Sequence, residues 1–100
     1  MSFGIPEQML FAIPNGGLRN QIVARKMKAE GVRAGIPDLF LAVPAGPYSG
    51  LFVEMKKAHG GKVSCAQIAI MSLLNAQGYR TIVCHGWSEA REAIKAYLGG

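Results

Sequence analysis

The chain lacks the features that mark membrane, secreted and zinc-binding proteins. Its 100 residues contain no apolar run near the roughly 18 residues of a membrane-spanning helix. The N-terminus has neither the basic start nor the apolar stretch of a signal peptide. The two cysteines, Cys65 and Cys84, form no CxxC pair, and no histidine lies at zinc-like spacing. We therefore expect one cytoplasmic domain over residues 1–100, with free thiols and no membrane partner.

Acidic residues are also scarce. Six Asp and Glu stand against eleven Lys and Arg, which gives a net charge of +5 and a pI of about 9.6. Five of the basic residues fall between positions 19 and 33, namely Arg19, Arg25, Lys26, Lys28 and Arg33. This bias favours a polyanionic partner, with nucleic acid first and an anionic membrane surface second. Basic residues that only keep the surface soluble are the alternative.

Hydrophobic patterning predicts an α/β fold in the order β-α-β-β-α-β-α. We expect strands at 9–13, 39–43, 51–57 and 81–84, and helices at 18–30, 64–78 and from Ser88 to the C-terminal end. The loop 44–50 should return the chain antiparallel. The passage from 51 to 84 reads as a strand-helix-strand unit, whose two strands should be parallel with a right-handed crossover. A mixed sheet flanked by helices follows.

The last two helices have clear sequence starts. Ser64-x-x-Gln67 has the form of a capping box, and Ser88 is expected to cap the final helix. The helix that begins at Ser64 is apolar on more than one side, so we expect neighbouring elements or a second subunit to cover it.

Two carboxylates and a lysine stand within apolar strands. Asp38 opens one strand, and Glu54 lies inside another, with Lys56 two positions on. Because side chains alternate across a strand, Glu54 and Lys56 share a face with Phe52. A buried acid is costly unless it is paired or holds a cation. Two acids and an ammonium are the parts that a divalent-metal phosphodiesterase needs.

Each of these residues has a structural alternative. Asp38 could be a turn carboxylate, and Glu54 and Lys56 an ordinary ion pair, although a solvated strand rarely contains Leu51-Phe52-Val53 just before them. Gln67 could do no more than close the capping box. Tyr48, in the loop between the two motif strands, could contact DNA or pack in a dimer.

Around these residues the chain resembles a known family. Pro37-Asp38 followed by Glu54-x-Lys56 matches the PD-(D/E)xK nuclease signature. The surrounding sequence is similar to the VRR-NUC domain in its small stand-alone phage form. The matching segments are Ile13-Pro14-Asn15-Gly16-Gly17, Gly31-Val32-Arg33-Ala34-Gly35-Ile36-Pro37-Asp38, Phe52-Val53-Glu54-Met55-Lys56, Ser64-x-x-Gln67, Gln77-Gly78-Tyr79 and Gly86-Trp87-x-Glu89-Ala90. The chain departs from the family at Ala34, where the family has arginine, and in its short N-terminal segment, whose sole acid is Glu7.

The resemblance implies a restriction-endonuclease-like core, dependence on Mg²⁺ or Mn²⁺, and cleavage of DNA phosphodiesters. It also implies a homodimer similar to Holliday-junction resolvases, and a bacterial host cytoplasm if the chain is phage-encoded. Asp38 and Glu54 would bind the cation, with the backbone carbonyl of Met55 as a third ligand. Lys56 would orient the attacking water or neutralise the phosphate, and Gln67 would assist it.

The sequence thus predicts a metal-dependent, structure-specific endodeoxyribonuclease that acts on branched DNA. Phosphate contacts are expected from Arg19, Arg25, Lys26 and Arg33. A flap or nicking nuclease with the same chemistry, or a non-catalytic DNA-binding module of the same fold, are the alternatives.

Overall fold

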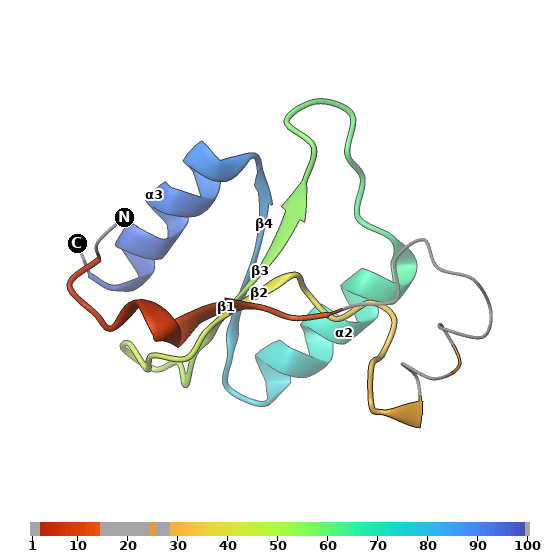
Figure 1. Ribbon diagram of the computed structural model, residues 1–100, viewed down its shortest axis with the longest axis horizontal. Coiled ribbons are helices and arrows are strands. Elements are labelled where there is room, and N and C mark those ends of the chain that lie inside the picture. Colours follow the sequence, from red (N-terminus) through yellow and green to blue (C-terminus); the bar gives the residue numbers. More distant parts are fainter. Residues whose placement is uncertain (1–2, 15–24, 26–28, 100) are drawn as a thin grey trace.

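A mixed β-sheet between two helices organises the computed structural model, which describes residues 3–14, 25 and 29–99 (Figure 1). In chain order the elements are the 3-10 helix η1 (Glu7–Met9), β1 (Leu10–Ala12), β2 (Leu39–Leu41), β3 (Leu51–Lys56), α2 (Cys65–Ala76), β4 (Arg80–His85) and α3 (Trp87–Tyr97). Most of the helix expected at 18–30 lies outside the described residues. None of the described helices has the length and hydrophobicity to traverse a membrane.

The described strands lie in the order β1-β2-β3-β4. The pairs β1–β2 and β2–β3 are antiparallel, and β3–β4 is parallel, so the predicted mixed sheet is confirmed. In the parallel pair, Glu54 lies opposite Val83 and Lys56 lies opposite His85. The connection through α2 therefore brings the end of β4 beside the motif residues of β3.

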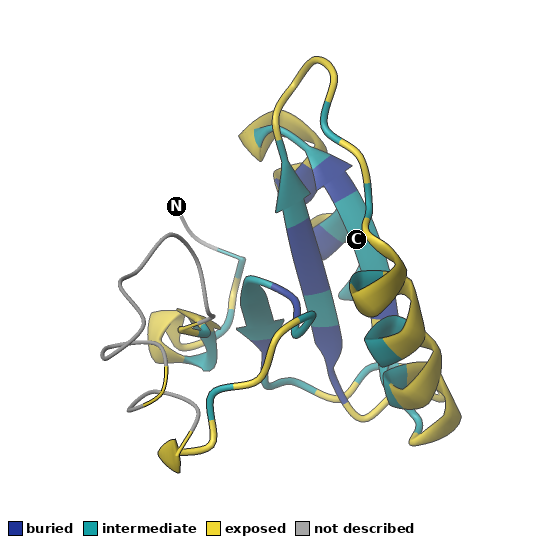
Figure 2. Ribbon diagram, turned by 90° about the vertical axis from the view of Figure 1, so that its right-hand side faces the viewer, coloured by how far each residue is buried: buried dark blue, intermediate teal, exposed yellow. Residues whose placement is uncertain are grey.

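Strand β3 is the structural centre because both of its faces are covered (Figure 2). Leu51 and Val53 are fully buried in the core that α3 completes with Ala90 and Ile94. On the other face Phe52 stacks on Phe40, with ring centroids 4.4 Å apart. The predicted alternation is confirmed, since an apolar core forms on one side while Glu54 and Lys56 occupy the other.

Helix α2 begins as predicted but is less covered than expected. The Ser64 side chain accepts the Gln67 N–H at 3.1 Å, and Gln67 Oε1 accepts the Ser64 N–H at 2.8 Å, which completes the capping box. Ile68 and Leu73, however, are 56% and 64% exposed. The expectation that neighbouring elements cover this face is wrong for the described part of the chain, and cover by a second subunit stays a prediction.

The start of α3 differs from the prediction. The helix begins at Trp87 after Gly86, which supplies no side-chain cap, so Ser88 is not the N-cap. Strand β4 runs on through His85, and the turn into the helix follows at once. Glu89 of the first turn accepts the His85 N–H at 2.9 Å instead. At the far end, the Tyr97 hydroxyl donates to the Val43 carbonyl at 2.6 Å and joins α3 to the chain after β2.

Gly35 allows the segment before Asp38 to lie against α2. Its φ is +87°, and a Cβ there would stand 2.8 Å from the Ala66 carbonyl oxygen and 3.1 Å from Ile70 Cγ1. The first of these atoms is helix backbone, which cannot move aside cheaply. Gly35 therefore fixes how closely the Asp38 segment approaches the helix that carries Gln67.

We expect Gly35→Ala to cost about 1–3 kcal/mol more unfolding free energy than Gly31→Ala, measured by urea denaturation. Gly31 is the matched control, because its φ of +97° imposes similar backbone strain while nothing lies within 4 Å of its added Cβ. Equal losses for the two variants would show that the contact with α2 does not constrain this segment.

Candidate active site

Asp38 reaches the motif strand through a backbone hydrogen bond. It directly precedes β2, where its own carbonyl accepts the Ile13 N–H at 2.8 Å. The pairing of β2 with β3 ends at Leu39 and Val53, so the following part of β3 has no strand beside it there. The Asp38 carboxylate takes that place, and its Oδ2 accepts the Met55 N–H at 2.8 Å.

The Met55 carbonyl faces the same side of β3 as Asp38. The carbonyls of Gly50 and Lys56 accept N–H groups from β4 and its continuation, so even-numbered carbonyls point towards β4. Orientation alternates along a strand, and the N–H and carbonyl of one residue point the same way. The N–H and carbonyl of Met55 therefore both point towards Asp38.

Glu54 is a buried acid with an unsatisfied oxygen. The residue is 3% exposed, and its Oε1 has no hydrogen-bond partner in the described structure. Its Oε2 lies 3.8 Å from Lys56 Nζ, which is an ion pair but a long one. Buried polar atoms nearly always have a partner, so a bare carboxylate oxygen calls for a missing proton, water or cation.

The pKa of Glu54 is raised from its ordinary 4.5 to about 7, chiefly because the carboxyl group is buried. A hydrogen bond with the Asp38 side chain and the negative charge of Asp38 contribute to this increase, whereas the charge of Lys56 opposes it. Two carboxyl groups that share a hydrogen bond are within reach of a single ion. A divalent cation between them would reverse the effect, because it favours both ionised forms.

Lys56 is held by Gln67. Its Nζ donates to Gln67 Oε1 at 2.9 Å, and the same oxygen accepts the Ser64 N–H. Gln67 therefore closes the capping box and contacts Lys56 with the same oxygen. The capping interaction and the contact with the lysine, which the sequence offered as alternatives, occur together. A residue at the start of α2 thus positions the Lys56 ammonium group on β3.

The donor set fits a hard cation that keeps much of its water. The described residues contain no group of three or more His, Cys, Asp and Glu side chains suited to a metal. Glu7 is exposed in η1 and does not join Asp38 and Glu54. The fitting oxygens are the two carboxylates and the Met55 carbonyl. Mg²⁺ is usually bound by one or two carboxylates with water and phosphate, so this set is sufficient.

The basic residues predicted to contact DNA are partly described. Arg25 and Arg33 are exposed, whereas Arg19 and Lys26 lie outside the described residues. The sequence pattern indicates a loop position for His85, in contact with solvent or phosphate, but the structure places it at the end of β4, opposite Lys56. Its Nε2 lies 3.4 Å from the Gly61 carbonyl oxygen. The parallel pairing was predicted, but the register that brings His85 to Lys56 was not.

The raised pKa of Glu54 predicts how metal-free stability depends on pH. Below pH 4.5 both folded and unfolded chains hold the proton, so its contribution to stability is fully present. Between 4.5 and about 7 the folded chain binds the proton more tightly, so this contribution, roughly 3 kcal/mol, is lost as pH rises. We expect urea denaturation in a chelator to show this loss, and Glu54→Gln to remove it. Parallel pH profiles for the two proteins would contradict the assignment.

Comparison with known proteins identifies the family of the chain and supports its fold. The VRR-NUC domain family matches residues 5–88 of the chain. A solved structure described as a VRR_NUC domain protein is similar, with a TM-score of 0.79 and 29% identity over 92% of this chain and 69% of its own. No curated protein matches. The four-stranded mixed sheet fits the PD-(D/E)xK nuclease fold of that neighbour. The chain therefore belongs to the VRR-NUC family, a nuclease family.

Proposed function

We propose that the protein is a metal-dependent endodeoxyribonuclease that hydrolyses DNA phosphodiesters. The observation that carries the proposal is the bare Oε1 of Glu54, buried beside Asp38 and Lys56. A structural ion pair does not require this arrangement, because a carboxylate that serves Lys56 alone would be cheaper at the surface. A role for the Glu54 carboxylate as a ligand of a divalent cation explains its burial and its unpartnered oxygen.

The Asp38 and Glu54 carboxylates and the Met55 carbonyl would hold Mg²⁺ or Mn²⁺. When bound, the ion supplies Lewis-acid stabilisation and makes a water molecule easier to ionise. The chain contributes the position of these oxygens. Asp38 is fixed by the Met55 N–H, and Glu54 is fixed by its place on the central strand.

Lys56 supplies a positive charge beside the site. Its Nζ is 3.8 Å from Glu54 and 2.9 Å from Gln67, which leaves further N–H donors for a phosphate oxygen or the attacking water. Preorganised charge of this kind stabilises the developing negative charge of phosphoryl transfer without further rearrangement. Gln67 acts as a positioning residue, because it holds the lysine.

We further propose that the protein acts as a homodimer on branched DNA, in the manner of a Holliday-junction resolvase. Two symmetric cuts across a four-way junction require two active sites, which a two-fold dimer provides. Helix α2 supports association of copies, since its twelve residues include no charged side chain although its outer face is exposed. The exposed Arg25 and Arg33 offer phosphate contacts that are independent of sequence.

Cleavage of four-way, flap, splayed and linear duplex DNA with Mg²⁺ or Mn²⁺ tests this proposal. We expect symmetric nicks in the four-way junction by the wild type. Lys56→Ala and Glu54→Gln should lower the cleavage rate at least about 100-fold, since each removes charge from the reacting centre. Binding of junction DNA, measured by fluorescence anisotropy, should remain for both variants. Lys95→Ala is the matched control, because it removes an exposed lysine from α3, on the other face of the sheet.

The substrate profile separates the alternatives. Preferential cutting of flaps, or cutting that leaves single nicks, would show that the four-way junction is not the substrate. The proposed metal-dependent hydrolysis of phosphodiesters would then still hold. If wild type and Lys56→Ala are equally inert on every structure, the protein is a DNA-binding module and the proposed nuclease activity is wrong.

A further inference from the structure

Strand β4 presents an open edge. It pairs with β3 on one side, and no described strand lies on the other. The N–H groups of Arg80 and Gly86 point to the β3 side, where they donate to Gly50 and Lys56. By alternation, the N–H and carbonyl groups of Thr81, Val83 and His85 point outwards. An exposed edge of this kind is a template for another strand.

Charged side chains of opposite sign occupy the two ends of this edge. At the start of β4, Arg80 Nη1 donates to the Thr81 carbonyl at 3.1 Å. At its end, Glu89 Oε1 accepts the His85 N–H at 2.9 Å. Val83 lies midway between these two ends. Its outward-pointing N–H and carbonyl have no partner in the described structure. The edge is positive at one end, negative at the other and open in the middle.

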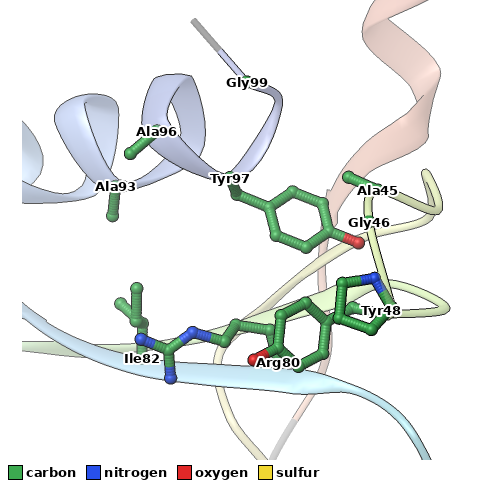
Figure 3. Close-up of a pocket in the computed structure, with 10 residues that line it drawn as sticks. Ala45, Gly46, Tyr48, Arg80, Ile82, Ala93, Ala96, Tyr97 and Gly99 are labelled. Carbon is green, nitrogen blue, oxygen red and sulfur yellow. The ribbon is translucent and has the colours of Figure 1, made fainter.

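An apolar groove runs along the same edge, between β4 and α3. Two cavities of about 420 and 480 Å³ lie next to each other here, and Ile82 and Ala93 line both of them. The first contains Arg80 with Tyr48 and Tyr97, and Figure 3 shows Ala93 and Ala96 of α3 on the opposite side of this cavity from β4. The second contains Glu89 and Glu92. The groove therefore repeats the charge order of the edge.

We propose that β4 of a second copy of this chain occupies the groove, antiparallel to the first, with the two-fold axis at Val83. Val83 would pair with its symmetry mate, and Thr81 with His85 of the other copy, which uses every outward N–H and carbonyl of the three residues. The inference rests on the proposed homodimer and names the surface that forms it. The two sheets become one continuous sheet.

Charge complementarity identifies the second copy as the occupant. Antiparallel pairing places Arg80 of each copy beside the end of the other β4, where Glu89 accepts the His85 N–H. Each arginine then exchanges its own Thr81 carbonyl for a carboxylate, and each Glu89 releases the His85 N–H to the new strand. Arg80 of each copy then faces Glu89 of the other, so opposite charges meet at both ends of the paired strands although each chain carries a net charge of +5.

The same pairing accounts for an exposed tryptophan. Trp87 is 46% exposed at the start of α3, directly after the residue that would lie opposite Arg80 of the other copy. It would reach the cavity that holds Arg80, Tyr48 and Tyr97, which offers aromatic rings and a cation to an indole. Large aromatic residues of this kind are enriched at the centres of interfaces.

The arrangement also sets the geometry of the two active sites. A two-fold axis normal to the sheet keeps both copies of the Glu54 face on one side. Glu54 lies level with Val83, so the two glutamates would be separated by three strand spacings, about 14 Å. Both sites would then face a single DNA molecule.

Charge reversal tests the surface, with dimer dissociation measured by sedimentation velocity. We expect Arg80→Glu and Glu89→Arg each to raise the dissociation constant at least about 10-fold, and the double variant to return to within about threefold of wild type. Arg91→Glu is the matched control, because it changes the net charge as Arg80→Glu does but lies on α3 outside both cavities. Recovery in the double variant separates a lost contact from a lost fold.

Trp87→Ala should weaken the dimer in the same assay, whereas Phe11→Ala should not. Phe11 is 44% exposed but lies on β1, at the opposite edge of the sheet. A wild-type dimer that none of the groove variants affects would overturn this surface and leave the proposed nuclease chemistry intact. A wild-type monomer at 100-fold above the concentrations of the cleavage assay would overturn the homodimer as well. The metal-dependent cleavage of the monomer then reports separately on the chemistry.

Discussion

The structure depends on the placement of an acid inside the sheet. Glu54 lies buried on strand β3, and one of its oxygens has no partner among the described residues. Asp38 adds a second negative charge to the same place, and the single ammonium of Lys56 does not satisfy both. The fold holds two carboxyl groups together at a cost in stability, which a divalent cation would offset.

The surrounding elements hold this arrangement in place. The early end of the β2–β3 pairing leaves room for the Asp38 carboxylate, and the Met55 N–H fixes it there. The capping box that starts α2 also carries the oxygen that holds Lys56. A hydrogen bond that begins a helix thus sets the position of a charged group on a strand. Because one side chain performs both tasks, helix start and site geometry are coupled.

Much of this follows from local patterns, and the remainder depends on long-range contacts. The alternation in β3 and the Ser64-x-x-Gln67 box predicted the faces of the strand and the start of α2, since both depend on neighbouring residues alone. Ser88 was a wrong cap because β4 extends to His85, and strand length is set by pairing with β3. The proximity of His85 to Lys56 required the β3–β4 register, which no local signal specifies. The bare oxygen of Glu54 appears only after packing.

The most direct test of this account is to locate a metal ion at the site. Crystals of the protein grown with Mn²⁺ above pH 8 would show the ion by anomalous X-ray scattering, without DNA or activity. We expect one peak beside the carboxylates of Glu54 and Asp38, which would hold the ion, and no such peak in Glu54→Gln. A site without the ion, in which Glu54 remains protonated and hydrogen-bonded to Asp38 at that pH, would contradict the account.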